Sequence, residues 1–183
     1  ALTMPYPCGS SSVVEYGDPY DLMGIFGSQG EFSLEHRRVM GYAPASEIIS
    51  VTDSGEFDIG SLNNPASFIK GLQISRPGGI GYLSLEYRQE AAFASNQQNG
   101  AFIRVIPPKD ISPGPGFYPF IDTVIVDGSP GVSGFTYATL ELGGRFTDPD
   151  SGVVVTPLLV SPSGMRIAVT YPGDPLPPLP AVP

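Results

Sequence analysis

The chain of 183 residues is long enough to bury a hydrophobic core, in one or two domains. Its 23 Gly and 21 Pro, with only 15% charged residues, argue against long helices and favour short strands joined by turns. A formal net charge of −9 with dispersed Lys and Arg argues against a nucleic-acid partner, and no apolar run reaches the length of a membrane span.

The chain begins with a segment that is predicted to be irregular. Residues 1–12 are rich in Pro, Gly and Ser and have no periodicity. Residues 15–24 (EYGDPYDLMG) contain two Gly and one Pro, which favour a tight turn. Acidic and tyrosine residues precede Leu22 and Met23, so we expect a polar turn that delivers this apolar pair to a buried surface. Cys8 is the only cysteine in the sequence. It is therefore either a free thiol or joined by a disulfide to a cysteine outside this sequence.

One short helix is predicted within residues 33–40. Ser33 is the expected N-cap, Leu34 belongs to the apolar side, and Gly41 ends the helix. His36, the only histidine, is followed by two arginines, and a lone imidazole in that setting is expected to be a solvated surface residue rather than a metal ligand or a pH sensor.

The remainder of the chain has the alternating pattern of β-strands. Phe68, Leu72 and Ile74 are expected to point inward, and Glu86 and Arg88 share one strand face, where pairing with opposite charges across strands is the simplest explanation. Short strands at this spacing predict a mainly β fold, one or more β-sandwiches with one short helix after the irregular segment. The strands are expected within residues 48–52, 56–59, 68–75, 80–88, 101–106, 120–126, 137–142, 153–160 and 165–171.

Composition also predicts how the chain is divided. A cluster of Pro and Gly near residues 112–118 is a candidate boundary between two β-rich regions. The end of the chain is too rich in Pro to pair in a sheet and is expected to be an extended, polyproline-type tail. The predicted divisions are residues 1–44, 45–111, 112–171 and 172–183.

Four segments resemble, in order along the chain, a family of secreted zinc metallopeptidases, those of the gametolysin type and their immune-inhibitor-A-like relatives. EYGDPYDLMG (15–24) resembles their Met-turn segment, and FSLEHRRVM (32–40) resembles the helix that follows it. YLSLEYRQ (82–89) is similar to a strand that follows in these proteins, and GGRFTDPDSGVVV (143–155) is similar to a hairpin of their C-terminal β-domain. The resemblance implies secretion, and it implies that Met23 is the methionine beneath the catalytic zinc.

The chain also departs from this family. The zinc-binding His-Glu-x-x-His helix needs two histidines one turn apart and a glutamate as general base, and this sequence has one histidine. The chain is therefore not expected to hydrolyse peptides by itself. Either the zinc and its ligands belong to an upstream part outside this sequence, acting on an extracellular protein or glycoprotein, or catalysis has been lost.

Two further functions stay open at this point. A non-catalytic extracellular structural or adhesive protein would assemble into homo-oligomers or filaments through strand edges and the Pro-rich tail. A carbohydrate-binding β-sandwich is the third alternative, suggested only by the tyrosines.

Carboxylates supply the other candidate sites. Glu15, Asp18 and Asp21 are candidates for a substrate cleft or a calcium site, although the spacing of a calcium loop is absent and a turn that hydrogen-bonds its own backbone is favoured. Asp148 and Asp150 are candidates for calcium binding at a hairpin, where a simple Asp/Gly turn is likewise favoured. No nucleophile elbow and no phosphate-binding P-loop occur in the sequence.

Overall fold

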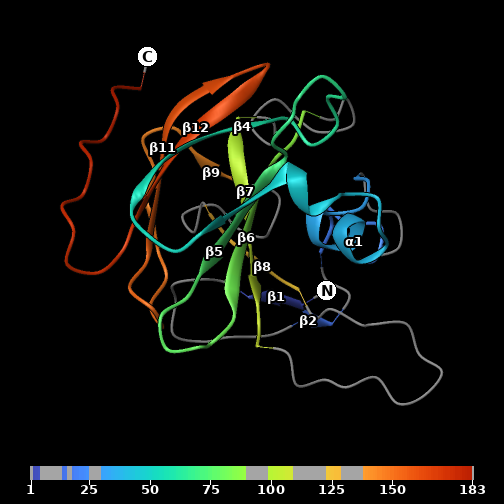
Figure 1. Cartoon of the computed structure of the whole chain (residues 1–183), viewed down its shortest axis with the longest axis horizontal. Coiled ribbons are helices and arrows are strands. Elements are labelled where there is room, and N and C mark those ends of the chain that lie inside the picture. Colours follow the sequence, from blue (N-terminus) through green and yellow to red (C-terminus); the bar gives the residue numbers. More distant parts are fainter. Residues whose placement is uncertain are drawn as a thin grey trace.

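The computed structural model describes residues 2–4, 14–15, 18–24, 30–89, 99–108, 123–128 and 138–182. These residues form a mainly β fold with two sheets and one short α-helix, which confirms the fold class predicted from the sequence (Figure 1).

The larger sheet, here called sheet A, has eight strands in the order β2-β1-β8-β7-β6-β5-β3, with β9 paired to β7. Most neighbours are antiparallel, but β1 pairs with β8, and β3 with β5, in parallel. The strands are β1 (Leu2–Met4), β2 (Val14–Glu15), β3 (Ile48–Val51), β5 (Gly71–Ser75), β6 (Tyr82–Tyr87), β7 (Gly100–Ile106), β8 (Val124–Val126) and β9 (Leu140–Glu141).

The smaller sheet, here called sheet B, is antiparallel and has the order β10-β11-β12-β4. Its strands are β10 (Phe146–Thr147), β11 (Val154–Ser161), β12 (Gly164–Thr170) and β4 (Gly55–Gly60). Since β4 lies between β3 and β5 in the chain but pairs with β12, the connection crosses from one sheet to the other and returns.

The hydrophobic core lies between the two sheets. Alternate residues of the sheet A strands, such as Leu72, Leu85 and Ile103, belong to one buried cluster with Val155 and Ile167 of sheet B. Residues on both sides of the predicted boundary near 112–118 therefore share one core, while the boundary itself lies outside the described residues.

The opposite face of sheet A, here called the outer face, is also covered. Helix α1 (Leu34–Val39), followed by the 3-10 turn η1 (Ala45–Glu47), lies on the side of sheet A that faces away from β11 and β12 (Figure 1). The register of the strands places Gln73, Ser84, Glu86, Phe102 and Arg104 on this face. The sheet therefore has an apolar face inside the sandwich and a largely polar face beneath the helix.

Local signals in the sequence set the limits of the helix. The Ser33 hydroxyl accepts a hydrogen bond from the His36 backbone N–H, as an N-cap does, and Gly41 adopts φ 80° directly after the helix, which confirms both predicted ends. Leu72 and Ile74 are fully buried as predicted, but the prediction for Phe68 is wrong. Its side chain is 76% exposed because β5 begins only at Gly71, so the alternation does not extend back to it.

Residues 172–182 form neither helix nor strand, as predicted for the Pro-rich tail. A hydrogen bond of 2.6 Å from Arg145 Nη2 to the Pro177 carbonyl fastens this tail to the body. Among the described residues, no helix is long and apolar enough to cross a membrane.

Candidate functional site

The turn at residues 18–24 is built by two aspartates that bond its own backbone. Asp18 Oδ1 accepts the Tyr20 N–H at 2.8 Å, and Asp21 Oδ1 accepts the Met23 N–H at 3.0 Å. Gly24 closes the turn, where a Cβ atom would lie only 1.9 Å from the Asp18 carbonyl oxygen. The favoured interpretation of the sequence, a turn that hydrogen-bonds its own backbone through aspartate, is confirmed.

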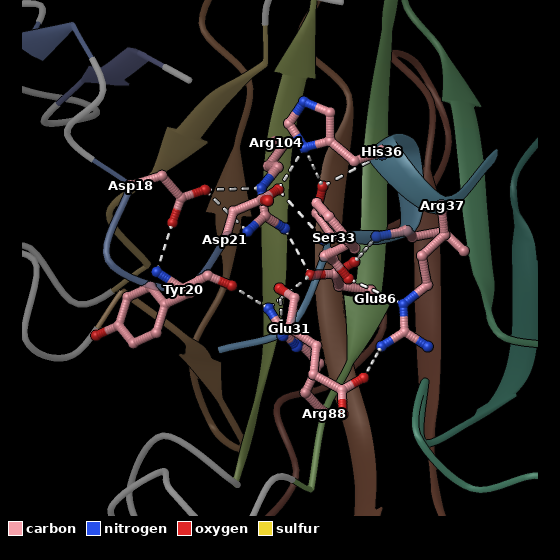
Figure 2. A network of polar contacts seen from close by, with 12 residues as sticks. Asp18, Tyr20, Asp21, Glu31, Ser33, His36, Arg37, Glu86, Arg88 and Arg104 are labelled. Atoms are coloured by element: carbon pink, nitrogen blue, oxygen red, sulfur yellow. Dashed lines mark hydrogen bonds and ion pairs between the residues drawn. The ribbon is translucent and has the colours of Figure 1, made fainter. Parts of the chain in front are cut away.

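The second carboxylate oxygen of Asp18 faces into the protein and meets Arg104 of β7. Arg104 Nε and Nη2 lie 3.0 and 2.9 Å from Asp18 Oδ2, and Nη1 lies 2.6 Å from Glu86 Oε1 on the adjacent strand β6 (Figure 2). All three side chains are at most 2% exposed. Burial lowers the pKa of Arg104, but the charges of Asp18 and Glu86 outweigh burial and raise this pKa above its ordinary value.

A second arginine on the outer face holds the two ends of the segment before the helix. Arg88 donates to the Tyr20 carbonyl and, at 3.0 Å, to the Glu31 carbonyl. Its guanidinium carbon lies 5.8 Å from the centre of the Phe102 ring, which also packs against Tyr20 at 4.9 Å. Arg88 and Phe102 therefore bind both backbone and side chain of this segment to sheet A.

Asp21 is joined to the helix by His36. His36 Nδ1 lies 2.6 Å from Asp21 Oδ2, and the Ser33 backbone N–H donates to the same oxygen at 3.2 Å. Burial raises the pKa of Asp21, but the hydrogen bond with His36 and the charge of Arg104 outweigh it and hold this pKa well below its ordinary value. The prediction that His36 is a solvated surface residue is wrong, because its side chain is 13% exposed and is paired with a buried carboxylate.

These side chains form one buried ionic network, here defined as Asp18, Asp21, His36, Glu86, Arg88 and Arg104. In it, three carboxylates face two guanidinium groups and the His36 imidazole. Buried charges without partners cost several kcal/mol each, and here every one has a partner. The network therefore holds the turn and the helix in one position on sheet A.

The network also decides what the turn presents to the outside. Asp18 and Asp21 are fully buried, whereas Leu22 is 52% exposed and Met23 is 43% exposed. The prediction that the turn buries Leu22 and Met23 is wrong, because the aspartates occupy the inward positions to reach arginine and histidine. Glu15 belongs to β2, and its side chain lies outside the described residues, so a site formed by all three carboxylates stays a prediction.

The acidic turn between β10 and β11 has a similar construction. Arg76 Nε and Nη2 lie 2.7 and 3.0 Å from the two oxygens of the fully buried Asp148, and Nη2 lies 2.7 Å from Asp150. Gly152 closes the turn with φ 73° and donates its N–H to the Asp148 carbonyl at 2.7 Å. The favoured Asp/Gly turn is confirmed, and its arginine partner ties sheet B to the end of β5.

The sequence prediction of cross-strand charge pairing is confirmed for Glu86, which pairs with Arg104 at a diagonal position on β7. The ion pair of Arg88 is instead with Glu86, two positions away on the same stretch of chain, at 3.6 Å. Arg104 itself was not singled out by the sequence. The available signal was its position as the one charged residue in the apolar strand at residues 101–106. In the described part of the chain, no three His, Cys, Asp or Glu side chains are grouped as a metal site.

Comparisons of the chain with models of protein families, with curated proteins and with solved structures find no match.

Proposed function

We propose that this chain is the C-terminal portion of a secreted zinc metallopeptidase-like protein and that the turn at residues 18–24 is its Met-turn. The proposal begins from the resemblance of four segments in order. The structure adds that two fully buried aspartates fix this turn. It also leaves Leu22 and Met23 52% and 43% exposed, contrary to their expected burial, so the role of Met23 as an apolar floor requires a part of the protein outside this sequence to cover it. A residue that supports a metal centre must be held rigidly in place, as the two aspartates hold this turn.

The division of roles follows from the residues present. The sequence has one histidine and therefore no His-Glu-x-x-His segment, so the zinc ligands and the general base of such an enzyme would belong to a part of the protein outside this sequence. Zinc, where bound, would polarise the scissile carbonyl and supply the activated water. This chain would keep the Met23 thioether in place, through Asp18 and Asp21, and would add a β-sandwich to the enzyme.

The test measures three properties of the natural secreted protein: its intact mass, its zinc content and its hydrolysis of a protein substrate. The proposal expects a larger polypeptide with a His-Glu-x-x-His segment and one zinc ion per chain. In that protein, Met23→Ser should lower zinc retention and activity. Met40→Ser is the matched control, since Met40 has a similar exposure of 41% and lies at the end of α1. A metal-free natural protein of the present size would reject the proposal.

A second candidate function, a self-assembling extracellular structural protein, is favoured by a different observation. Leu176, Leu179 and Val182 in the tail are 49%, 50% and 64% exposed. In the polyproline II conformation that the sequence predicts, which repeats every three residues, these side chains would share one face of the tail; Pro177 and Pro180 are partly covered. Such an apolar stripe suits packing against a neighbouring copy.

This candidate predicts that the natural protein is multimeric in light scattering and that Leu176→Ser with Leu179→Ser makes it monomeric. Leu159→Ser provides a control, because Leu159 has a similar exposure of 55% but lies in β11. A monomeric natural protein would reject the structural function and would leave the peptidase proposal unaffected.

A further inference from the structure

We infer that a hollow at the C-terminal end of α1 is a binding site for a neutral carbohydrate. The hollow has a volume of about 380 Å³. Its polar lining is Arg38 from α1, Ser50 from β3 and Gln73 from β5, and its apolar lining includes Ala43, Pro44 and Ile48. A mainly apolar hollow of a few hundred cubic ångström with a few placed polar groups is typical of sites for small ligands.

A buried carboxylate holds the polar lining in position. Glu35 is fully buried, and its oxygens accept from Arg38 Nε at 2.9 Å, from Gln73 Nε2 at 3.1 Å and from the Tyr82 hydroxyl at 2.8 Å. Arg38 Nη2 also lies 3.2 Å from the Tyr82 hydroxyl. Arg38 and Gln73 therefore do not need to be ordered when a ligand arrives, which lowers the entropic cost of binding.

The same arrangement leaves three polar groups of the lining without a partner in the described part of the chain. They are Arg38 Nη1, a donor; the Gln73 side-chain oxygen, an acceptor; and the Ser50 hydroxyl, which serves as either. Ser50 and Gln73 are direct neighbours across the β3–β5 pair, so their side chains lie on the same face of sheet A. Adjacent hydroxyl groups on a sugar ring present a matching set of donors and acceptors.

Charge and shape favour a neutral sugar over other ligands. Glu35 neutralises Arg38, so the hollow has no net charge, and the chain carries −9, which opposes an anion. Tyr42 lies in the chain between the lining residues Gly41 and Ala43 and is 72% exposed, but its side chain is not part of the lining, so its ring can stack only on a sugar unit that extends beyond the hollow. A peptide added to the free edge of β3 would use backbone groups and would not need these three side-chain groups.

This site is independent of the proposed function, because neither a metallopeptidase part nor a structural protein requires it. The probes are trisaccharides of glucose, mannose, galactose and N-acetylglucosamine, titrated into the full chain by calorimetry. At least one is expected to bind with a Kd below about 1 mM, the weak end of specific association. Tyr42→Ala and Ser50→Ala should each weaken binding about fivefold, the loss expected for one stacking contact or one hydrogen bond.

The controls are matched by residue type and exposure. Phe68→Ala and Ser163→Ala remove an aromatic ring and a hydroxyl from a different hollow, formed by β4 and β12, and should not change the Kd. Both test residues are exposed, so circular dichroism should show all four variants folded. The inference is overturned if no trisaccharide binds, if the control variants weaken binding as much as the test variants, or if a sulfated glycan or an extended peptide binds this face in preference to every neutral sugar.

Discussion

Replacing Arg104 by methionine should be among the most damaging single changes in this protein. Methionine keeps much of the length of the side chain but removes the charge and every N–H donor. Asp18 would lose both contacts to its inward oxygen, and Glu86 would lose its closest cation, at 2.6 Å. Glu86 would keep the Leu34 N–H and the more distant Arg88 at 3.6 Å, so Asp18 is the more isolated of the two.

Breaking a buried ion pair from one side costs about 3–5 kcal/mol, because an uncompensated charge is left inside the protein. Domains are stable by only about 5–15 kcal/mol in total, so Arg104→Met should remove a large part of the free energy of unfolding. The measurement is urea unfolding followed by circular dichroism, since the chain has no tryptophan for fluorescence.

The matched control is Arg166→Met. Arg166 forms a bidentate ion pair with Asp58, in which Nε and Nη2 lie 2.8 and 2.9 Å from the two carboxylate oxygens, but the two side chains are 47% and 69% exposed. An exposed pair contributes little to the free energy of unfolding, since water already solvates both charges. Equal and small losses in the two variants would refute the reasoning that burial, rather than pairing geometry, gives Arg104 its importance.

The remaining predictions concern other parts of the structure. The pKa of Asp21 is lowered in the folded state, so the stability that the ionised Asp21 side chain contributes is complete above about pH 4 and is lost as the pH falls further. The free energies of unfolding of the wild type and Asp21→Asn should therefore converge in acid. Arg76→Lys should lower the free energy of unfolding in urea by about 2 kcal/mol, because lysine cannot reproduce the bidentate contact with the buried Asp148. An unchanged midpoint of unfolding would contradict this. Leu34→Ala should lower the free energy of unfolding by about 3 kcal/mol, because Leu34 is fully buried. Met23→Ala should change it by less than about 0.5 kcal/mol, because Met23 is 43% exposed. Similar shifts of the melting temperature in the two variants would contradict this difference in packing.

The local features of the fold were predictable because their causes are local. Ser33 caps α1 by accepting a hydrogen bond from the backbone N–H of His36, three residues later, and Gly41 ends the helix by adopting a positive φ. Residues 82–87 alternate with the period of a strand, which places Leu83 and Leu85 in the core. In each case the residues that decide the conformation lie within a few positions of one another.

The environment of the polar strand face was not predictable in the same way. A polar face on a strand usually meets water, and nothing near Glu86 in the sequence indicates otherwise. The network that closes over it joins Arg104 to Asp18, which lie 86 positions apart, and Glu86 to the N–H of Leu34, 52 positions away. The same separation explains why His36 appeared to be a surface residue, since its partner Asp21 comes from a different segment.

The positions of most strands along the chain, the helix with its caps and the two aspartate turns follow from the sequence alone, because hydrogen bonds between near neighbours and the alternation of side chains determine them, whereas the order of strands in the two sheets does not. Only the tertiary structure decided which side of the turn at residues 18–24 faces inward. Asp18 and Asp21 are buried and need partners that their own segment does not provide, and Arg104 of β7 and His36 of α1 supply them. Pairing those charges turns Asp18 and Asp21 toward sheet A and leaves Met23 at the surface.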